Sequence, residues 1–119
     1  MKYINLLGTH AEHVGLGQFA AALYRAFEIV DGEERESVNY IGGVYLKGTR
    51  DGMEFSIALS DEDVYEDLPY WIHISADVED IEFLDEAVSK LVQDKARPAG
   101  FRLAKIINFG KRGEERIDY

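Results

Sequence analysis

The sequence has no cysteine, only two prolines and no long hydrophobic run. The lack of cysteine excludes disulfides, thiolate catalysis and cysteine zinc sites, and it fits a reducing compartment such as the cytoplasm. The first residues contain one basic side chain and an apolar run too short for a secretory signal. No segment approaches the ~20 apolar residues that a membrane-spanning helix needs. We therefore expect a cytoplasmic protein with no membrane partner.

Basic residues are scarce overall and almost absent from one segment. The chain carries 13 Lys and Arg against 23 Asp and Glu, a net charge of -10. Residues 61–96 hold twelve acids against Lys90 and Lys95, whereas residues 97–119 hold six bases against three acids. Because the net charge repels phosphate backbones at long range, direct nucleic-acid binding is disfavoured. A basic protein partner is favoured instead.

The composition is that of an ordered globular chain. Of the 119 residues, 46% are hydrophobic and 30% are charged, which separates the chain from disordered sequences. This length is typical of one domain with its own core. We expect a single domain over residues 1–119, with no cofactor.

Apolar periodicity predicts two helices and five strands. Residues 53–59 alternate between apolar and polar, as in a half-buried strand, and Asp51-Gly52 before them is a favoured hairpin turn. Thr9 and Glu12 match a capping box, which predicts a helix start near Thr9, although Gly15 and Gly17 weaken the first turns and favour a stable helix only from Gln18. Asp80 precedes a second amphipathic stretch, which Pro98 ends. Expected strands cover residues 3–7, 38–47 (with a bulge at 42–43), 53–59, 70–78 and 101–109, with a loop at 33–37 and a charged tail at 110–119.

These elements occur in the order β-α-β-β-β-α-β. Short connections between consecutive strands favour antiparallel pairing, and each helix has one apolar stripe to bury. We therefore predict an α+β fold, with two helices packed on one face of a four- to five-stranded, mostly antiparallel sheet.

Two short patterns resemble ligand-binding motifs. His10 and His13 lie three residues apart, as metal ligands on one helix face would, but the pattern is not that of zinc proteases. Residues 15–20 match the Gly-x-Gly-x-x-Ala dinucleotide pattern, but they do not directly follow a strand in a βαβ unit. Neither pattern predicts a site, although a metal at His10 and His13 stays open.

The acidic segment at residues 61–67 contains five carboxylates in seven residues. It lacks the glycine and the final glutamate of an EF-hand loop, so a solvated loop is favoured over a calcium site. Aromatic residues accompany it, and aromatics beside carboxylates suit a surface that binds a basic partner. The predicted partner-binding residues are Asp61, Glu62, Asp63, Tyr65, Glu66, Asp67, Tyr70, Trp71 and His73.

Strand alternation places Trp71, His73, Ser75 and Asp77 opposite Ile72 and Ile74, so Trp71 either is exposed or packs under another element. Bases of the last segment, Arg102 to Arg116, would neutralise part of the acidic surface if they lie against it.

In size, charge and aromatic placement, the chain resembles the small acidic immunity proteins with which bacteria neutralise nuclease toxins. The resemblance rests on no shared motif, and it implies a non-enzymatic inhibitor with a basic partner. One alternative is a small-ligand protein or enzyme that uses His10, His13 or His73 with Glu12 or Asp77 as acid and base. A self-associating structural domain is the other alternative.

Overall fold

The computed structural model describes residues 1–61 and 63–119. Seven strands form one antiparallel sheet in the order β2-β3-β4-β5-β1-β6-β7. The strands are β1 (Lys2–His10), β2 (Glu33–Glu36), β3 (Val44–Arg50), β4 (Met53–Leu59), β5 (Tyr70–Ala76), β6 (Phe101–Ile107) and β7 (Glu115–Asp118). The helices are α1 (Leu16–Ala26) and α2 (Ile81–Leu91), which continues into the π-helical turn η3 (Val92–Ala96), and the 3-10 turns are η1 (Ile41–Gly43) and η2 (Asp63–Tyr65). In the described part of the chain, no helix has the length and apolar character to cross a membrane.

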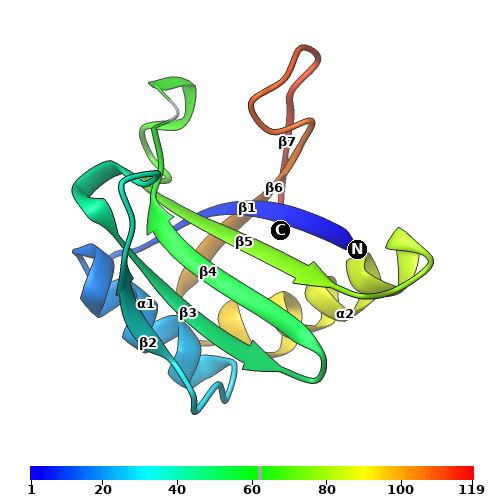
Figure 1. Ribbon diagram of the computed structural model, residues 1–119, viewed down its shortest axis with the longest axis horizontal. Coiled ribbons are helices and arrows are strands. Elements are labelled where there is room, and N and C mark those ends of the chain that lie inside the picture. The colour runs from blue at the N-terminus through cyan, green and yellow to red at the C-terminus, as the bar shows by residue number, and fades with distance from the viewer. Residues whose placement is uncertain (62) are drawn as a thin grey trace.

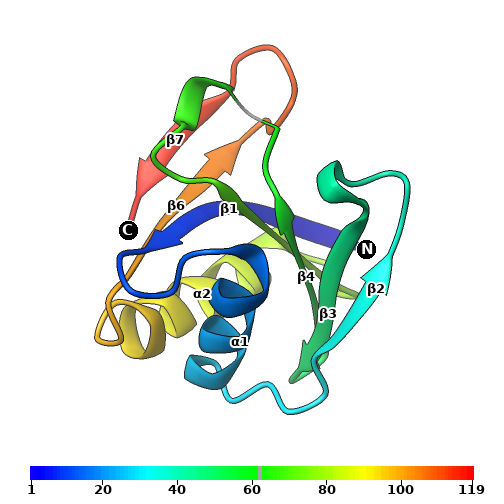
Figure 2. The same ribbon diagram turned by 90° about the vertical axis from the view of Figure 1, so that its left-hand side faces the viewer.

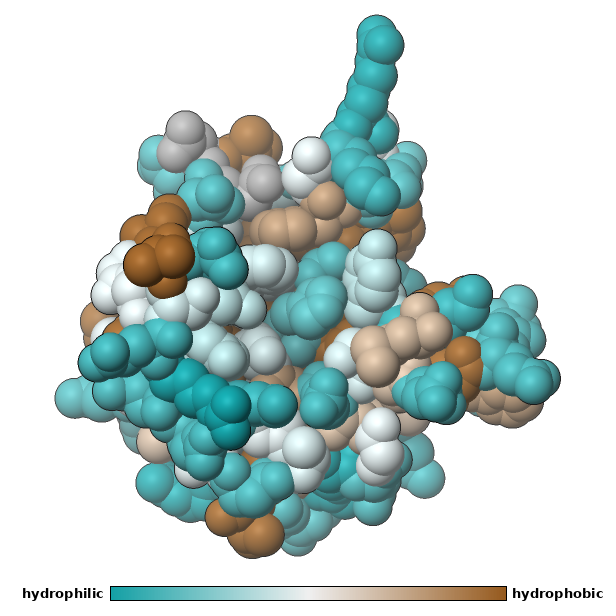
Figure 3. Space-filling view, in the orientation of Figure 1, coloured by the Kyte–Doolittle hydropathy of each residue, from teal (hydrophilic) through white to brown (hydrophobic). Residues whose placement is uncertain are grey.

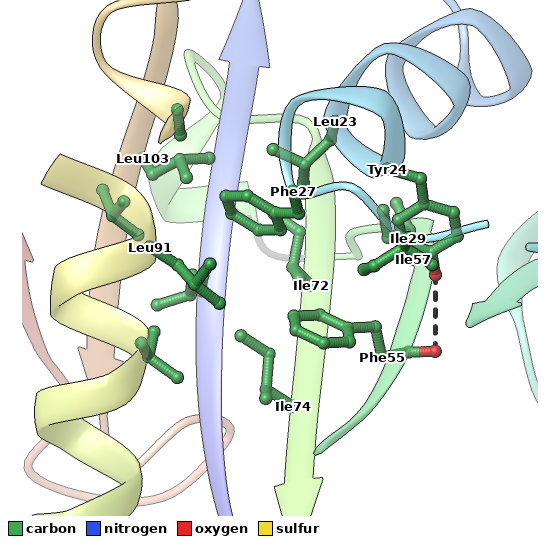
Figure 4. Packing of buried hydrophobic residues seen from close by; sticks show 14 of the residues in the cluster. Leu23, Tyr24, Phe27, Ile29, Phe55, Ile57, Ile72, Ile74, Leu91 and Leu103 are labelled. Carbon is green, nitrogen blue, oxygen red and sulfur yellow. Dashed lines mark hydrogen bonds between the residues drawn. The ribbon is translucent and has the colours of Figure 1, made fainter. Parts of the chain in front are cut away.

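Both helices pack on one face of the sheet, which curls around them (Figures 1 and 2). This confirms the predicted α+β class and the placement of the helices. Phe19 and Leu23 of α1, and Phe27 directly after it, are buried against Phe55 and Ile72 of the central strands; Figure 4 labels all of these except Phe19. Full burial of such side chains contributes about 1.5–3 kcal/mol each, so their contact stabilises the packing of α1 on the sheet.

The Tyr24 hydroxyl group joins α1 to the sheet. It donates a hydrogen bond to the Leu46 carbonyl oxygen at 2.6 Å and lies 3.3 Å from the Phe55 carbonyl oxygen, a contact drawn in Figure 4. Gly48 lies beneath the ring, where a Cβ atom would come within 3.3 Å of it. The glycine therefore lets the tyrosine reach the strand backbone.

The expected number of strands is wrong, because the sheet has seven strands instead of four or five. The two missed strands are β2 and β7, with the sequences EERE and ERID, at the two edges of the sheet. Neither has the apolar alternation of a strand that buries one face. Charged side chains on short edge strands are typical, since they discourage pairing with other chains.

The predicted helix start at Thr9 is also wrong. Thr9 pairs with Arg102 inside β1, which runs to His10, and α1 begins only after Gly15. Gly15 has φ 99°, a conformation that favours glycine and sets the turn into the helix. Pairing with β6 overrides the local capping-box pattern.

Two strand predictions have different outcomes. Residues 53–59 form β4 with the predicted bounds, after an Asp51-Gly52 turn in which both φ angles are positive. Residues 38–43 are not a strand, because Gly42 and Gly43 have φ angles of 78° and 75° and turn the chain before β3. What was expected as a bulge is therefore a turn.

Two glycine-to-alanine substitutions should change the free energy of unfolding in opposite directions and so test this packing. A Cβ atom at Gly8 would lie 2.3 Å from Leu103 Cδ2, so we expect Gly8→Ala to lower the free energy of unfolding by about 1–3 kcal/mol. Gly17 lies in α1 with open space around it, and Gly17→Ala should raise that free energy by up to about 1 kcal/mol. Urea denaturation of both variants measures the two values, and equal effects would contradict the register of β1 and β6.

Candidate functional site

The face of the sheet that the helices leave uncovered carries a group of aromatic rings. We call this group the outer aromatic patch. It comprises Tyr3, Tyr40, Tyr45, Trp71, His73 and Phe109. Figure 3 looks onto this face, where pale surface of intermediate hydropathy lies among teal polar groups.

The rings of the patch touch one another in a continuous series. Trp71 lies at its centre, with ring centroids 5.2 Å from the stacked Phe109, 5.9 Å from Tyr40 and 5.9 Å from His73. Tyr40 stacks on Tyr45 at 4.7 Å. At the other end, His73 lies 5.4 Å from Tyr3, whose side of the patch is open to solvent. The patch is thus a preformed surface with partly exposed ring faces.

Asn5 connects two of these rings by hydrogen bonds. Its Oδ1 atom accepts from Trp71 Nε1 at 2.9 Å and lies 2.8 Å from His73 Nδ1. Since the indole nitrogen only donates, the shared Asn5 atom is an oxygen, and His73 Nδ1 must carry a proton to bond it. Neutral His73 therefore has its lone pair on Nε2, which has no hydrogen-bond partner among the described residues.

Burial among the rings lowers the pKa of His73 below its ordinary value of 6.5. The direction follows from desolvation, which disfavours the charged imidazolium. At neutral pH the group is a neutral acceptor at Nε2. Such an atom suits a hydrogen-bond donor on a bound partner.

A small apolar cluster on the same face holds part of the patch in place. Leu7, Leu68, Ala104 and Ile106 are buried there, and Tyr65, Trp71 and Phe109 pack against them. The cluster joins β1 and β6 to the η2 segment and to the β6–β7 hairpin. Both of these project from the outer side of the sheet (Figures 1 and 2).

The acidic η2 segment is bound to the β6–β7 hairpin by charge. Arg116 donates two hydrogen bonds to the Asp67 carboxylate, at 3.0 and 2.9 Å, and its guanidinium lies 5.6 Å from the Tyr65 ring centroid. The hydrogen bonds from Arg116 lower the pKa of Asp67. Arg102 lies 3.4 Å from the same carboxylate. Arg102 and Arg116 of the basic last segment therefore lie against the acidic segment and neutralise Asp67.

The other predicted acids have different positions. Asp61 and Glu66 are exposed and form no ion pair among the described residues. Glu62 and the side chain of Asp63 lie outside the part that the structure describes. Asp61 and Glu66 are thus the described carboxylates of this segment that stay free to attract a cation.

Tyr70 is not on the proposed surface. Its ring is buried on the helix-covered face, stacked on Phe19 at 4.4 Å, and its hydroxyl oxygen accepts a hydrogen bond from the Gly15 amide at 2.5 Å. Tyr70 alternates with Trp71 along β5, so only one of the two can face outward. This buried contact also occupies the first amide of the glycine pattern at residues 15–20.

The acids of residues 61–86 do not form one surface. Asp61 and Glu66 precede β5, whereas the acids from Asp77 onward follow it, at the start of α2. A strand of this length spans about 20 Å. The second group therefore lies at the opposite end of the sheet from the η2 segment.

His10, one of the two histidines near the amino-terminal end, has both ring nitrogens engaged and cannot pair with His13 to bind a metal in this arrangement. His10 Nε2 donates to the Ala99 carbonyl oxygen at 2.8 Å, and Nδ1 accepts from the Glu12 amide at 3.0 Å, so both ring nitrogens are used. His13 packs against the His10 ring at 4.5 Å. Among the described residues there is no group of three or more potential His, Asp or Glu metal ligands.

Sequence reasoning missed Tyr3, Asn5, Tyr40, Tyr45 and Phe109. Tyr3 and Asn5 alternate with the apolar Ile4 and Leu6, and this signal could have placed them on the outer face. Tyr40 and Tyr45 join the patch through the turn at η1 and through pairing across the sheet, which no local pattern reveals. No family model, curated protein or solved structure matches this chain.

The pKa of His73 gives a testable pH dependence. Because the folded state has the lower pKa, unfolded chains take up the proton first as the pH falls. The contribution of neutral His73 to stability is present above pH 6.5 and is lost as the pH drops below that value. We expect His73→Gln to flatten the fall in unfolding free energy between about pH 7 and pH 5, measured with urea. His13→Gln is the control, and an unchanged slope in His73→Gln would contradict the assignment.

Proposed function

We propose that the chain is a non-enzymatic binding domain that recognises a basic protein through the outer aromatic patch. The observation that carries the proposal is the hydrogen-bonded group of Asn5, Trp71 and His73 among aromatic rings, on the sheet face that the helices leave uncovered. Tyr and Trp supply large, stiff contact areas in protein interfaces. A patch of this kind on an uncovered face suits a contact surface.

The chemistry of the patch favours cationic side chains. Ring faces attract Lys and Arg, at about 0.5–1 kcal/mol when exposed and more when desolvated. His73 Nε2 adds a hydrogen-bond acceptor at the same place. The ring faces and the acceptor nitrogen can therefore both bind Arg or Lys side chains of a partner.

Charge around the patch supports the same partner. Two bases on β2 and β3 are paired, Arg35 with Glu33 and Lys47 with Glu54, so these two contribute little net positive charge. Asp61 and Glu66 lie in the segment that packs beside Trp71. With a net charge of -10, the whole chain attracts a basic protein at long range.

The finer proposal is an immunity protein that inhibits a bacterial nuclease toxin in the cytoplasm. A nuclease must bind phosphates and therefore presents basic residues around its active site. An acidic domain with an aromatic contact surface suits such a site. No cofactor enters the proposal.

Loss of the central ring should weaken this binding. We expect Trp71→Ala and, separately, Tyr45→Ala to raise the Kd for a basic nuclease domain encoded beside this gene by at least about tenfold, the effect of a truncated interface aromatic. Titration calorimetry and inhibition of DNA cleavage measure it. Phe83→Ala is the matched control, because Phe83 is a 67% exposed aromatic on α2, away from the patch. An equal loss of affinity in all three variants, or no loss in any of them, would contradict the proposal.

Neutralising the free acids should act on the association rate. The double variant Asp61→Asn, Glu66→Gln should associate several-fold more slowly at low salt, with the difference vanishing near 1 M salt. Asp77→Asn with Asp94→Asn removes the same charge away from the η2 segment and should act less. Stopped-flow mixing at two ionic strengths compares them, and identical rates for the two double variants would contradict a role for this segment.

A further inference from the structure

The sheet has an unpaired edge in its interior. β1 lies between β5 and β6, and it pairs with β5 over Lys2 to Gly8. Its pairing with β6 begins only at Leu6. Residues 2–5 therefore have a strand on one side alone. Every second residue of a strand directs its amide and carbonyl groups to the same side, so this half of β1 presents hydrogen-bonding groups without a neighbouring strand.

β6 leaves β1 because its end packs onto the outer face. Ile106 is buried in the small apolar cluster there, and Phe109 stacks on Trp71. Ile106 and Ile107 continue to pair with β7 on their other side. The contacts that anchor the outer aromatic patch thus open a wedge between β1 and the end of β6.

A cavity of about 450 Å³ occupies this wedge. Tyr3, Ile4 and Asn5 line one side, and residues 106–109 line the other. Ile81, Glu82, Asp85 and Lys105 also line it. The volume lies within the range of small binding pockets. The cavity therefore has the volume to hold part of a peptide chain.

We propose that this edge binds an extended segment of the basic partner as an added strand, antiparallel to β1 in the place that β6 leaves. Strand addition to a free edge is an established mode of peptide recognition. The inference rests on the proposed function only for the identity of the partner, since Tyr3 and Asn5 border both the cavity and the outer aromatic patch.

The lining predicts the sequence of the segment. Side chains of an added strand alternate, so one set lies over Ile4 and Ile81 and the other beside Tyr3 and Asn5 on the outer face. The first environment is apolar and the second suits cations. The segment should therefore alternate apolar and basic residues.

Charge at the cavity fits this choice. Lys105 is paired with Asp85 at 2.9 Å, so its charge is compensated. Glu82 is exposed and follows Glu79 and Asp80, which are exposed as well. Lys111 lines the hairpin side. Once the Lys105–Asp85 pair is set aside, the lining carries Glu82 against Lys111, and the exposed Glu79 and Asp80 that precede Glu82 add negative charge beside the cavity.

The test uses a synthetic peptide, acetyl-Lys-Val-Lys-Val-Lys-Val-amide, with the full-length chain. We expect amide hydrogen exchange in Lys2–Asn5, followed by NMR, to slow at least tenfold for the groups that face the cavity. A peptide with every backbone amide N-methylated, which has no N–H to donate to the edge, and a Glu-Val peptide of opposite charge should not slow it. Absent protection, or equal protection by the N-methylated peptide, overturns the inference.

Variants on one helix separate this inference from the proposed function. Ile81→Lys places a base in the cavity and should weaken peptide binding at least tenfold, whereas Phe83→Lys, on the other side of α2, should not. If Trp71→Ala weakens the basic nuclease domain while the peptide leaves the edge unprotected, strand addition fails and the binding function stands. If the peptide protects the edge while Trp71→Ala leaves nuclease binding unchanged, the binding function fails and the edge remains a peptide site.

Discussion

Burial of only one face of a seven-stranded sheet is the constraint on which the rest of this structure depends. The two helices are each eleven residues long, and both lie on the same side. Their apolar side chains and those of the strands form one continuous core on that side, with members from Ile4 to Leu103. Residues on the opposite face must then either be polar, so that water can solvate them, or be apolar and buried in small local clusters.

The chain uses both solutions on the uncovered face. At one end, Leu7, Leu68 and Ile106 form a small cluster that the η2 segment and the β6–β7 hairpin cover. In the middle, the Oδ1 atom of Asn5 accepts hydrogen bonds from two ring nitrogens, Trp71 Nε1 and His73 Nδ1. The aromatic surface and the interior strand edge are therefore products of the same arrangement, since the residues that anchor Trp71 also draw β6 away from β1.

Local patterns predicted the elements that bury one face each. β4 was found from alternation alone, and α2 from its N-cap Asp80, whose carboxylate accepts from the Glu82 amide. The edge strands β2 and β7 were missed because strand pairing, rather than apolar burial, defines them. At Thr9, the pairing of β1 with a strand far along the chain overrides a valid local helix signal.

The site was predicted in part for the same reason. Alternation along β5 correctly placed Trp71 and His73 on one face opposite Ile72. It also required Tyr70 to point inward, although proximity to the acids had suggested otherwise. The turn at η1 and the pairing of strands bring Tyr40, Tyr45 and Asn5 next to Trp71 and His73. No local sequence pattern therefore predicts these neighbours.

The central place of β1 has a consequence for biosynthesis. β1 is synthesised well before its two neighbours in the sheet, β5 and β6, which begin at Tyr70 and Phe101. Until those residues emerge, Leu6 and Leu7 have no neighbouring strand to pair with, and both edges of β1 stay unpaired. Closing so long a loop before any pairing gain slows folding. Early helix formation and the β3–β4 hairpin, which are local, then precede the step that inserts the amino-terminal strand and completes the sheet.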